Sequence, residues 1–446
     1  MKLKNEKEND RQKKSCRREK YFRKDIRWER LDNTAHLFPV ISGEKMTNVY
    51  RISVELNEEI QKEILQEALD EVLPKFNGFN LRLRRGIFWY YLEENGKPAP
   101  EVQEETGCPC SYIVQNQNRS YLFRVLYFKK RIHLEAFHVL ADGMGAINFL
   151  KELTYQYLRL RHPALREQVG DQLSVDSSLN REDSFLQYYR RGCEKGYPTK
   201  RAYLVEGELL RPGQMGVMHG VMSVGQLKEV CRRYEASINE YMVAAFVWAV
   251  YKEKEHAITE KRPLRIAVPV NLRPFFESVT TKNFFVMVSA EFSPQEQQEE
   301  YTFAQIVAVI RESLRSQIQK DYLEKLFSYN VSNEMNLAAR AVPLFIKNIA
   351  IKFVYTSAAL ANTSTVTNIG KIVVNEAYQP YISMFHAVLP MSKGQHIKGT
   401  ICSYQDTIIF SFSSILKDTW IQRNFFRQLA DDGILVEIES NGVYYE

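Results

Sequence analysis

Apolar residues recur along the chain with two different periods, which predict the order of strands and helices. Residues 51–56 alternate apolar and polar positions as a half-buried strand does, whereas residues 57–76 place apolar side chains every three or four positions as an amphipathic helix does. Two alternating runs at 121–128 and 131–140, joined by a short basic turn, predict a β-hairpin. A helix over 144–160 follows the hairpin.

Strands and helices begin again after residue 216. Helices are expected at 224–236, 237–254, 301–320 and 418–433, and strands at 264–270, 284–292, 365–374, 381–389, 397–404 and 407–413. Ser237 and Glu240 form a capping-box pattern at the start of the second helix. These features predict an α/β fold of layered α+β character, repeated twice.

With 446 residues the chain is too long for one ordinary core, so two domains are expected. We place the N-terminal domain at 28–165 and the C-terminal domain at 211–446. The linker at 166–210 includes a polar, poorly patterned stretch that is typical of a crossover. Residues 1–27 form a basic tail, expected to be a solvated, disordered extension, with binding to nucleic acid or anionic lipid as the alternative.

Charge is concentrated in that tail. Residues 1–30 contain 13 Lys/Arg and 6 Asp/Glu, so the remainder holds 60 − 13 = 47 basic and 54 − 6 = 48 acidic residues. The body shows no basic stripe, and nucleic acid is therefore not an expected partner.

Cysteine usage and hydropathy bear on the compartment. The six cysteines are scattered, and the one close pair, Cys108 and Cys110, lacks the second half of a zinc site, so we expect no metal. Unpaired thiols and the absence of a secretion signal predict a cytoplasmic protein. The most apolar stretch, 341–361, contains Lys347 and Lys352, which favours a partly buried helix over a membrane span.

The candidate chemistry lies where the predicted hairpin ends. On a strand through 132–138, His138 shares a face with Ile132, Leu134 and Ala136, and the chain then turns through Asp142 into a helix. Ligand crevices form at strand ends of α/β sheets. A partly desolvated imidazole there stays neutral at pH 7, as a general base must.

The hexapeptide HVLADG (138–143) resembles the His-x-x-x-Asp-Gly motif of the chloramphenicol acetyltransferase-like superfamily, which includes alcohol acetyltransferases, wax ester synthases and peptide condensation domains. The segments WERLDNTAHLFP, VGQLKEVCRRYEASINEYMVAAF, VPVNLRPFF and TSTVTNIGKI follow in the expected order, so the resemblance covers roughly residues 28–440. The pattern is most similar to the bacterial alcohol acetyltransferase branch.

The resemblance implies two chloramphenicol acetyltransferase-like domains forming a pseudo-dimer with an interdomain tunnel, and a monomer. His138 would be the general base in direct transfer of an acyl group, without an acyl-enzyme. Asp142 would pair with Arg273 to fix the loop, and Gly143 would permit the tight passage into the helix. The co-substrate would be acyl-coenzyme A, with no permanently bound cofactor, and the acceptor an alcohol or amine.

A stabiliser is also needed for the negative charge on the thioester oxygen. Thr365, Thr367 and Asn368 are the candidates, and Asn368 is our choice. Phe137 stands where condensation domains carry a second histidine, which counts against peptide-bond formation. Two alternatives stay open: a wax-ester or polyketide-associated enzyme using longer or carrier-protein-bound acyl donors, and a non-catalytic binding protein that keeps the fold.

Overall fold

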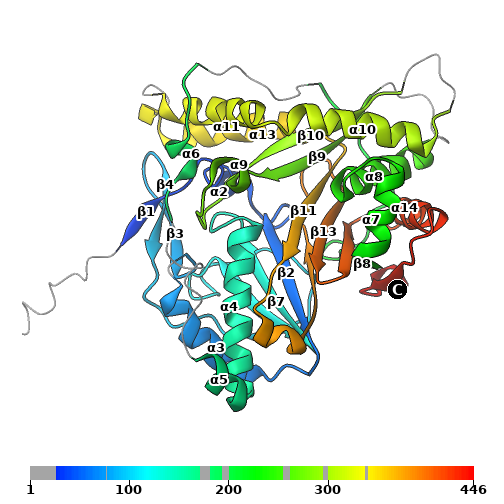
Figure 1. Ribbon diagram of the computed structural model, residues 1–446. Coiled ribbons are helices and arrows are strands. Elements are labelled where there is room, and N and C mark those ends of the chain that lie inside the picture. The colour runs from blue at the N-terminus through cyan, green and yellow to red at the C-terminus, as the bar shows by residue number, and fades with distance from the viewer. Residues whose placement is uncertain are drawn as a thin grey trace, which may run out of the picture.

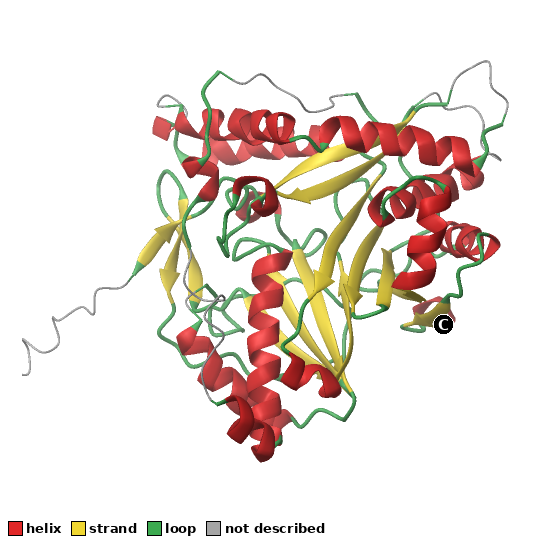
Figure 2. Ribbon diagram, viewed as in Figure 1, coloured by secondary structure: helices red, strands yellow, loops and turns green. Residues whose placement is uncertain are grey.

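The computed structural model describes residues 27–76, 78–170, 181–192, 200–254, 262–294, 300–336 and 340–445. Within these ranges the chain forms two large β-sheets and one small one, with helices packed around them (Figures 1 and 2). The fold is mixed α/β, as the sequence predicted. No described helix is long and apolar enough to cross a membrane.

The first large sheet has the strand order β12-β2-β7-β6-β5. Its strands are β2 (Val49–Leu56), β5 (Gln103–Glu104), β6 (Phe123–Phe128), β7 (Arg131–Phe137) and β12 (Ile382–Val388). The predicted hairpin is confirmed, since β6 and β7 pair antiparallel with Phe128 opposite Arg131. The helices of this half are α3 (Lys62–Val72), α4 (Gly143–Arg161) and α5 (Pro163–Val169). Apolar residues of α3 and α4 share one core with those of β2 and β7, and Figure 1 shows α4 crossing these strands.

The second large sheet has the order β10-β9-β11-β13-β14-β8-β15. Its strands are β8 (Gly216–Ser223), β9 (Leu264–Asn271), β10 (Phe285–Phe292), β11 (Ser364–Ile372), β13 (Ile397–Tyr404), β14 (Thr407–Ser414) and β15 (Glu437–Ser440). Helices α7 (Val224–Arg233), α8 (Ile238–Lys254), α10 (Phe303–Gln317) and α14 (Trp420–Asp431) pack with it around a second core. The capping box is confirmed, because Ser237 and Glu240 exchange both hydrogen bonds.

The small sheet and several helices complete the molecule. The small sheet is β1-β4-β3, formed by β1 (Trp28–Arg30), β3 (Leu81–Arg85) and β4 (Tyr90–Glu94). The remaining α-helices are α2 (Phe38–Ile41), α6 (Ser184–Gln187), α9 (Arg273–Phe276), α11 (Lys320–Met335) and α13 (Leu344–Ala359). Short 3₁₀ turns occur at Leu73–Lys75, Glu376–Tyr381 and Val443–Tyr445. The sequence did not predict α11. The helix expected at 57–76 is shorter in the structure, where α3 begins at Lys62 and ends at Val72.

One strand crosses between the two halves assigned from the sequence, whose boundaries stay a prediction. We placed every residue from 211 onward in the C-terminal domain, yet β12 pairs antiparallel with β2 of the first sheet, with Phe385 opposite Val54. The strand crosses because β2 would otherwise leave an unpaired edge. The same crossing brings β12 against β13, so the two large sheets meet at this strand.

Candidate active site

His138 follows directly after β7, at the end of the strand where the sequence placed it. Its backbone N–H donates to the carbonyl of Asn48, 3.0 Å away. Three aromatic rings surround the imidazole: Phe38 stacks on it with ring centroids 4.5 Å apart, and Tyr50 and Phe285 lie at 4.9 and 5.6 Å. These contacts hold the imidazole ring in one orientation.

Asn283 fixes the tautomer of His138. Its side-chain amide nitrogen donates to Asp32 Oδ2 (2.9 Å) and to the carbonyl of His138 (3.2 Å), both of which can only accept. The amide oxygen must therefore face the ring, where it lies 3.0 Å from His138 Nδ1. An oxygen at that position requires a proton on Nδ1, so Nε2 carries the lone pair. No described residue hydrogen-bonds to Nε2, and the side chain keeps partial exposure.

Burial lowers the pKa of His138 below its usual 6.5, although the charge of Asp142 and the contact with Asn283 oppose this. The expectation of a partly desolvated, neutral imidazole at pH 7 is thus met. Lys398 contributes in the same direction as burial, because a nearby positive charge disfavours the imidazolium.

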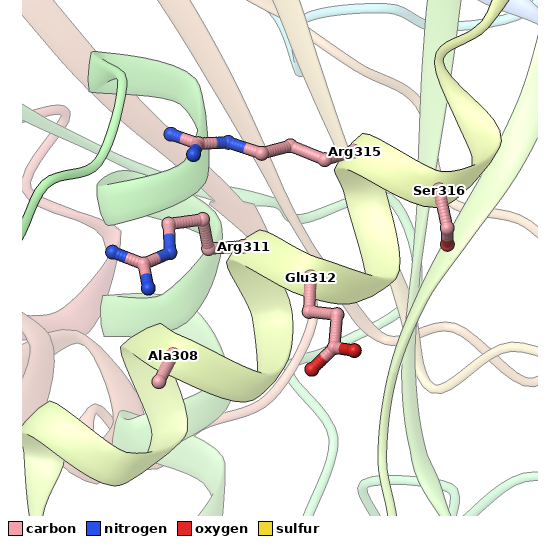
Figure 3. A pocket seen from close by; sticks show the side chains of 5 residues that line it. All are labelled: Ala308, Arg311, Glu312, Arg315 and Ser316. Atoms are coloured by element: carbon pink, nitrogen blue, oxygen red, sulfur yellow. The ribbon is translucent and has the colours of Figure 1, made fainter.

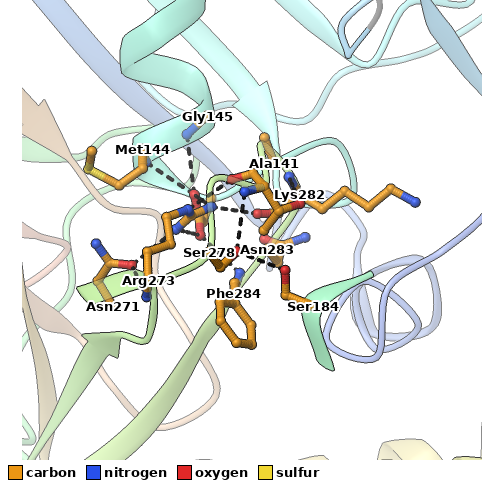
Figure 4. A network of polar contacts seen from close by, with 12 residues as sticks. Ala141, Met144, Gly145, Ser184, Asn271, Arg273, Ser278, Lys282, Asn283 and Phe284 are labelled. Atoms are coloured by element: carbon orange, nitrogen blue, oxygen red, sulfur yellow. Dashed lines mark hydrogen bonds and ion pairs between the residues drawn. The ribbon is translucent and has the colours of Figure 1, made fainter. Parts of the chain in front are cut away.

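Asp142 is the N-cap of α4 and accepts hydrogen bonds on both oxygens. Oδ1 accepts from the backbone N–H groups of Met144 and Gly145, and Oδ2 accepts from the N–H of Phe284 at 3.1 Å. Arg273 adds a bidentate contact, with Nη1 2.8 Å from Oδ2 and Nη2 3.1 Å from Oδ1 (Figure 4). The carboxylate is buried and both of its oxygens accept hydrogen bonds, so it is not available to donate a proton as a catalytic acid.

Arg273, at the start of α9, has five N–H donors, and the structure gives each an acceptor. Besides the two bonds to Asp142, its guanidinium donates to the carbonyls of Thr280 and Lys282 and to Asn271 Oδ1. Figure 4 shows these contacts converging on one side chain. The predicted pair of Asp142 and Arg273 therefore exists, and it ties the start of α4 to the loop that carries Asn283.

The role expected of Gly143 falls to a different glycine. Gly143 is the first residue of α4, it has no positive φ, and a Cβ built on it would meet nothing within 4 Å. A Cβ on Gly145 would lie 2.4 Å from the carbonyl oxygen of Thr281 and 2.7 Å from Ala141 Cβ. The close approach thus occurs two residues further along the helix, at Gly145, where the carbonyl of Thr281 in the 280–284 loop lies against it.

The structure does not join the proposed stabilisers to His138. Asn368 lies at an irregularity of β11 next to Gly370, whose N–H it accepts at 2.8 Å, and its amide nitrogen is 3.4 Å from Asn239. Thr367 pairs in register with Thr400 of β13. Neither hydrogen-bonds to the imidazole of His138 in the part of the chain that the structure describes, so their role stays a prediction.

Sequence reasoning missed Asn283 and Asp32, which are both 2% exposed and complete the surroundings of His138. They lie 145 and 106 residues away in sequence, so no local spacing links them to it. Burial raises the pKa of Asp32 to about 6, although Asn283 opposes this. The available signal was positional: Asn283 is a polar residue directly before a predicted strand.

Other polar groups and hollows do not extend the site. Within the described residues no group of three or more His, Cys, Asp or Glu side chains is arranged to hold a metal. One surface hollow is lined by Ala308, Arg311, Glu312, Arg315 and Ser316 of α10 (Figure 3). Its two arginines bind carbonyls and carboxylates at the turn between α7 and α8, which gives them a structural use.

Comparison with known proteins supports the fold. No protein-family model and no curated protein matches the sequence. Three solved structures are similar. The first condensation domain of the calcium-dependent antibiotic synthetase has a TM-score of 0.60 at 12% identity, covering 91% of this chain and 96% of that one. Polyketide synthase associated protein 5 from Mycobacterium tuberculosis has 0.57 at 13%, covering 90% and 96%. Trichothecene 15-O-acetyltransferase from Fusarium sporotrichioides has 0.56 at 11%, covering 91% and 95%.

These structures share the two-subdomain fold of condensation domains and chloramphenicol acetyltransferase-like enzymes, and the chain has that fold over about nine-tenths of its length. At 11–13% identity the likeness defines the architecture alone.

Proposed function

We propose that the chain transfers an acyl group from a coenzyme A thioester to an alcohol or amine, with His138 as general base. The observation that carries this proposal is the state of the imidazole: its Nδ1 proton is fixed by Asn283, its pKa is lowered, and Nε2 has no hydrogen-bond partner among the residues that the structure describes. A base of this kind needs a neutral ring with one lone pair aimed at the substrate.

The reaction would proceed in two stages at His138. Nε2 takes the proton of the acceptor hydroxyl or amine while the acceptor atom attacks the thioester carbonyl carbon. The tetrahedral oxyanion then collapses, the C–S bond breaks, and the thiolate receives the proton from Nε2. The products are the ester or amide and the free thiol. Asp142 and Arg273 have no part in these proton transfers, since both are saturated by internal bonds.

Stabilisation of the oxyanion is assigned to groups on the second large sheet. Asn368 and Thr367 of β11 are the candidates from the sequence. Lys398 of β13 adds a buried amine that donates a hydrogen bond to Ser392 Oγ at 2.5 Å. Its positive charge helps to lower the pKa of His138, which supports Lys398 as a further candidate. Removing one such donor costs about 10²–10³ in rate.

Product formation measured by mass spectrometry tests the proposal. The full chain is incubated with acetyl-coenzyme A and alcohols from ethanol to long-chain species, in three forms: wild type, His138→Ala and His133→Ala. His133 is a matched control because it is a buried histidine on β7, the strand that His138 follows directly. We expect an ester from wild type and from His133→Ala, and a loss of about 10²-fold or more in His138→Ala.

Equal rates in wild type and His138→Ala would remove this residue from the chemistry. If no ester forms with acetyl, longer acyl or carrier-protein-bound donors, the proposal is wrong and the protein binds ligands without catalysis. Ester from carrier-bound donors alone would correct the donor and keep the reaction class.

A further inference from the structure

Asp32 is a buried carboxylate without an ion-pair partner. It lies in the loop between β1 and α2, it is 2% exposed, and within the described ranges no Lys or Arg forms an ion pair with it. Lys282 favours the charge on Asp32, but its Nζ lies 3.9 Å from Glu29 Oε2 and donates to the carbonyl of Arg30. Burial of an unpaired charge is costly, so the position of this carboxylate needs an explanation.

The hydrogen bonds of the carboxylate are divided between its own loop and Asn283. Oδ1 accepts from the N–H of Ala35 at 2.8 Å, which fixes the carboxylate within the loop. Oδ2 accepts twice from Asn283, from the side-chain amide at 2.9 Å and from the backbone N–H at 3.3 Å. One oxygen is therefore anchored locally, and the other binds the residue that contacts His138 Nδ1.

The loop with Asp32 also supplies a ring that contacts the imidazole. Six residues after Asp32 comes Phe38, the first residue of α2, which stacks on His138. Asn283 donates in addition to the carbonyl of His138, so both hydrogens of its amide nitrogen have acceptors. The loop before α2, the end of β7 and the loop before β10 thus meet at one imidazole.

The charge on Asp32 decides which way the Asn283 amide points. A carboxylate can only accept, so it holds the NH₂ end of the amide and leaves the amide oxygen for His138 Nδ1. A reversed amide would set two oxygens against each other at hydrogen-bond distance and would turn its NH₂ group toward Nδ1. His138 would then carry its proton on Nε2 and offer no lone pair there.

The ionised form of Asp32 is also held at a cost. Burial raises its pKa to about 6, and the charge of Asp183 adds to this, whereas the hydrogen bonds from Asn283 and Ala35 oppose it. Because folding raises this pKa, ionised Asp32 lowers the stability of the fold at neutral pH relative to a neutral group in the same place. A residue that costs stability beside a candidate reactive group is expected where function requires it.

We propose that Asp32 is a positioning residue that sets the tautomer of His138. By accepting from the Asn283 amide nitrogen, its carboxylate keeps the imidazole proton on Nδ1 and the lone pair on Nε2. Asp32 itself touches neither the acyl donor nor the acceptor. The catalytic consequence rests on the proposed role of His138 as general base, whereas the tautomer can be measured without any reaction.

Asp32→Asn in the full chain tests the inference. Asparagine has nearly the same shape, and its oxygen can still accept from the N–H of Ala35. Its NH₂ group then faces Asn283, which must turn its amide around to offer the oxygen. ¹⁵N NMR of histidine-labelled protein in weakly alkaline buffer, with His138→Ala to identify the signal, should show the proton moved from Nδ1 to Nε2.

Kinetics on the same samples give a second measurement. We expect kcat of Asp32→Asn to fall by about 10²–10⁴-fold, the contribution of a general base. KM should change little, because the variant alters proton transfer and leaves substrate contacts in place. A residue with a structural role alone would not exchange the two ring protons, and thermal melting shows that the variant folds.

Asp183→Asn is the matched control. It removes a carboxylate whose charge acts on Asp32, and asparagine caps a helix as well as aspartate does, so α6 keeps its N-cap. This variant should keep the proton on Nδ1 and a kcat close to that of wild type.

Two results would overturn the proposal. A wild-type His138 protonated on Nε2 would do so whether or not the variants fold, and so would an Asp32→Asn protein that keeps the proton on Nδ1. If the tautomer changes as expected but wild type forms no ester with any donor, the acyl-transfer proposal fails and the positioning role of Asp32 stands.

Discussion

Strand β7 carries His133 and is followed directly by His138, and the two histidines share burial but differ in the contacts of their ring nitrogens. His133 is 2% exposed, and burial lowers its pKa as it lowers that of His138. His133 Nδ1 lies 2.7 Å from Ser53 Oγ, and its Nε2 faces Glu105 Oε2 at 3.3 Å. His138 has one nitrogen fixed and the other open. A depressed pKa therefore does not identify a base; an unused lone pair beside partial exposure does.

The two histidines also differ in the kind of side chain that surrounds them. The face of β7 with His133 holds a buried ionic network in which Glu135 contacts both Arg51 and Arg124. Burial would raise the pKa of Glu105, yet His133 and Arg51 lower it to about 2. At the other end of the strand, rings and one amide surround His138. One end of β7 is held in an ionic network, and the other leads into the residue that we propose as the general base.

Of the substitutions that test this comparison, removal of Arg273 should have the largest effect on stability and activity. Arg273→Ala leaves the buried carboxylate of Asp142 without its counter-charge, and we expect the free energy of unfolding to fall by about 3–5 kcal/mol. Activity per folded molecule should fall too, because the loop with Asn283 loses its anchor. Denaturant titration and kinetics on the same samples measure both.

Arg265→Ala is the control, since the Arg265 side chain is also largely buried (4% exposed, against 12% for Arg273) but pairs with Glu291 on the second sheet. It should cost stability without changing activity per folded molecule. If both variants lose activity to the same extent, Arg273 does not act on His138 through the loop that carries Asn283.

A smaller disturbance compares two glycines at the start of α4. Gly145→Ala forces a Cβ against the Thr281 carbonyl, so we expect about 1–3 kcal/mol of destabilisation. Gly143→Ala has open space and a helical position, where alanine is favoured by about 0.5–1 kcal/mol. Thermal or denaturant unfolding distinguishes them, and equal losses would contradict the assigned close approach.

The pH profile of kcat/KM sharpens the comparison further. A histidine base is active when neutral, so activity should fall as pH drops through a folded pKa below 6.5. Asn283→Ala removes a contact that raises the pKa of His138, and the acid limb should move to lower pH. Movement of the limb to higher pH would show that Asn283 does not face the imidazolium.

Lys398 gives the smallest effect, and in the opposite direction. Lys398→Met removes a charge that lowers the pKa of His138, so the acid limb should move to slightly higher pH. Burial lowers the pKa of Lys398 itself from 10.5 to about 7. The folded state then binds fewer protons than the unfolded state between pH 7 and 10.5, so stability rises with pH there. Unfolding curves at several pH values should show a weaker slope in Lys398→Met.

The sequence predicted those parts of the site that local pattern encodes. His138 ends an alternating strand, and Asp142 precedes a helix at the spacing of a cap, so both could be placed from neighbours within ten residues. Arg273 was placed by resemblance, and the structure brings it to Asp142. These residues share the property that a short segment determines their position.

Long-range packing determines what the sequence missed. The partnership of Asn283 with His138 arises only when the 280–284 loop meets α4, and no local pattern reports that meeting. The choice between Gly143 and Gly145 depends on the same contact, because the approaching carbonyl belongs to Thr281. The pairing of β12 with β2 could not be predicted for a related reason, since alternation identifies a strand at 381–389 without identifying its partner.

Strand β12 is synthesised long after β2, the strand with which it pairs. Its register places Ile382 opposite Leu56, so 382 − 56 = 326 residues separate these partners. At about 5–20 residues per second, roughly 16–65 seconds of synthesis pass between them. During that time the edge of β2 stands open beside a finished hairpin, a template for pairing with other chains. Stalled translation, or a gene truncated before residue 388, yields chains that lack all or part of β12 and leave the edge of β2 exposed. Fragments of the N-terminal half should therefore aggregate instead of folding as a free domain.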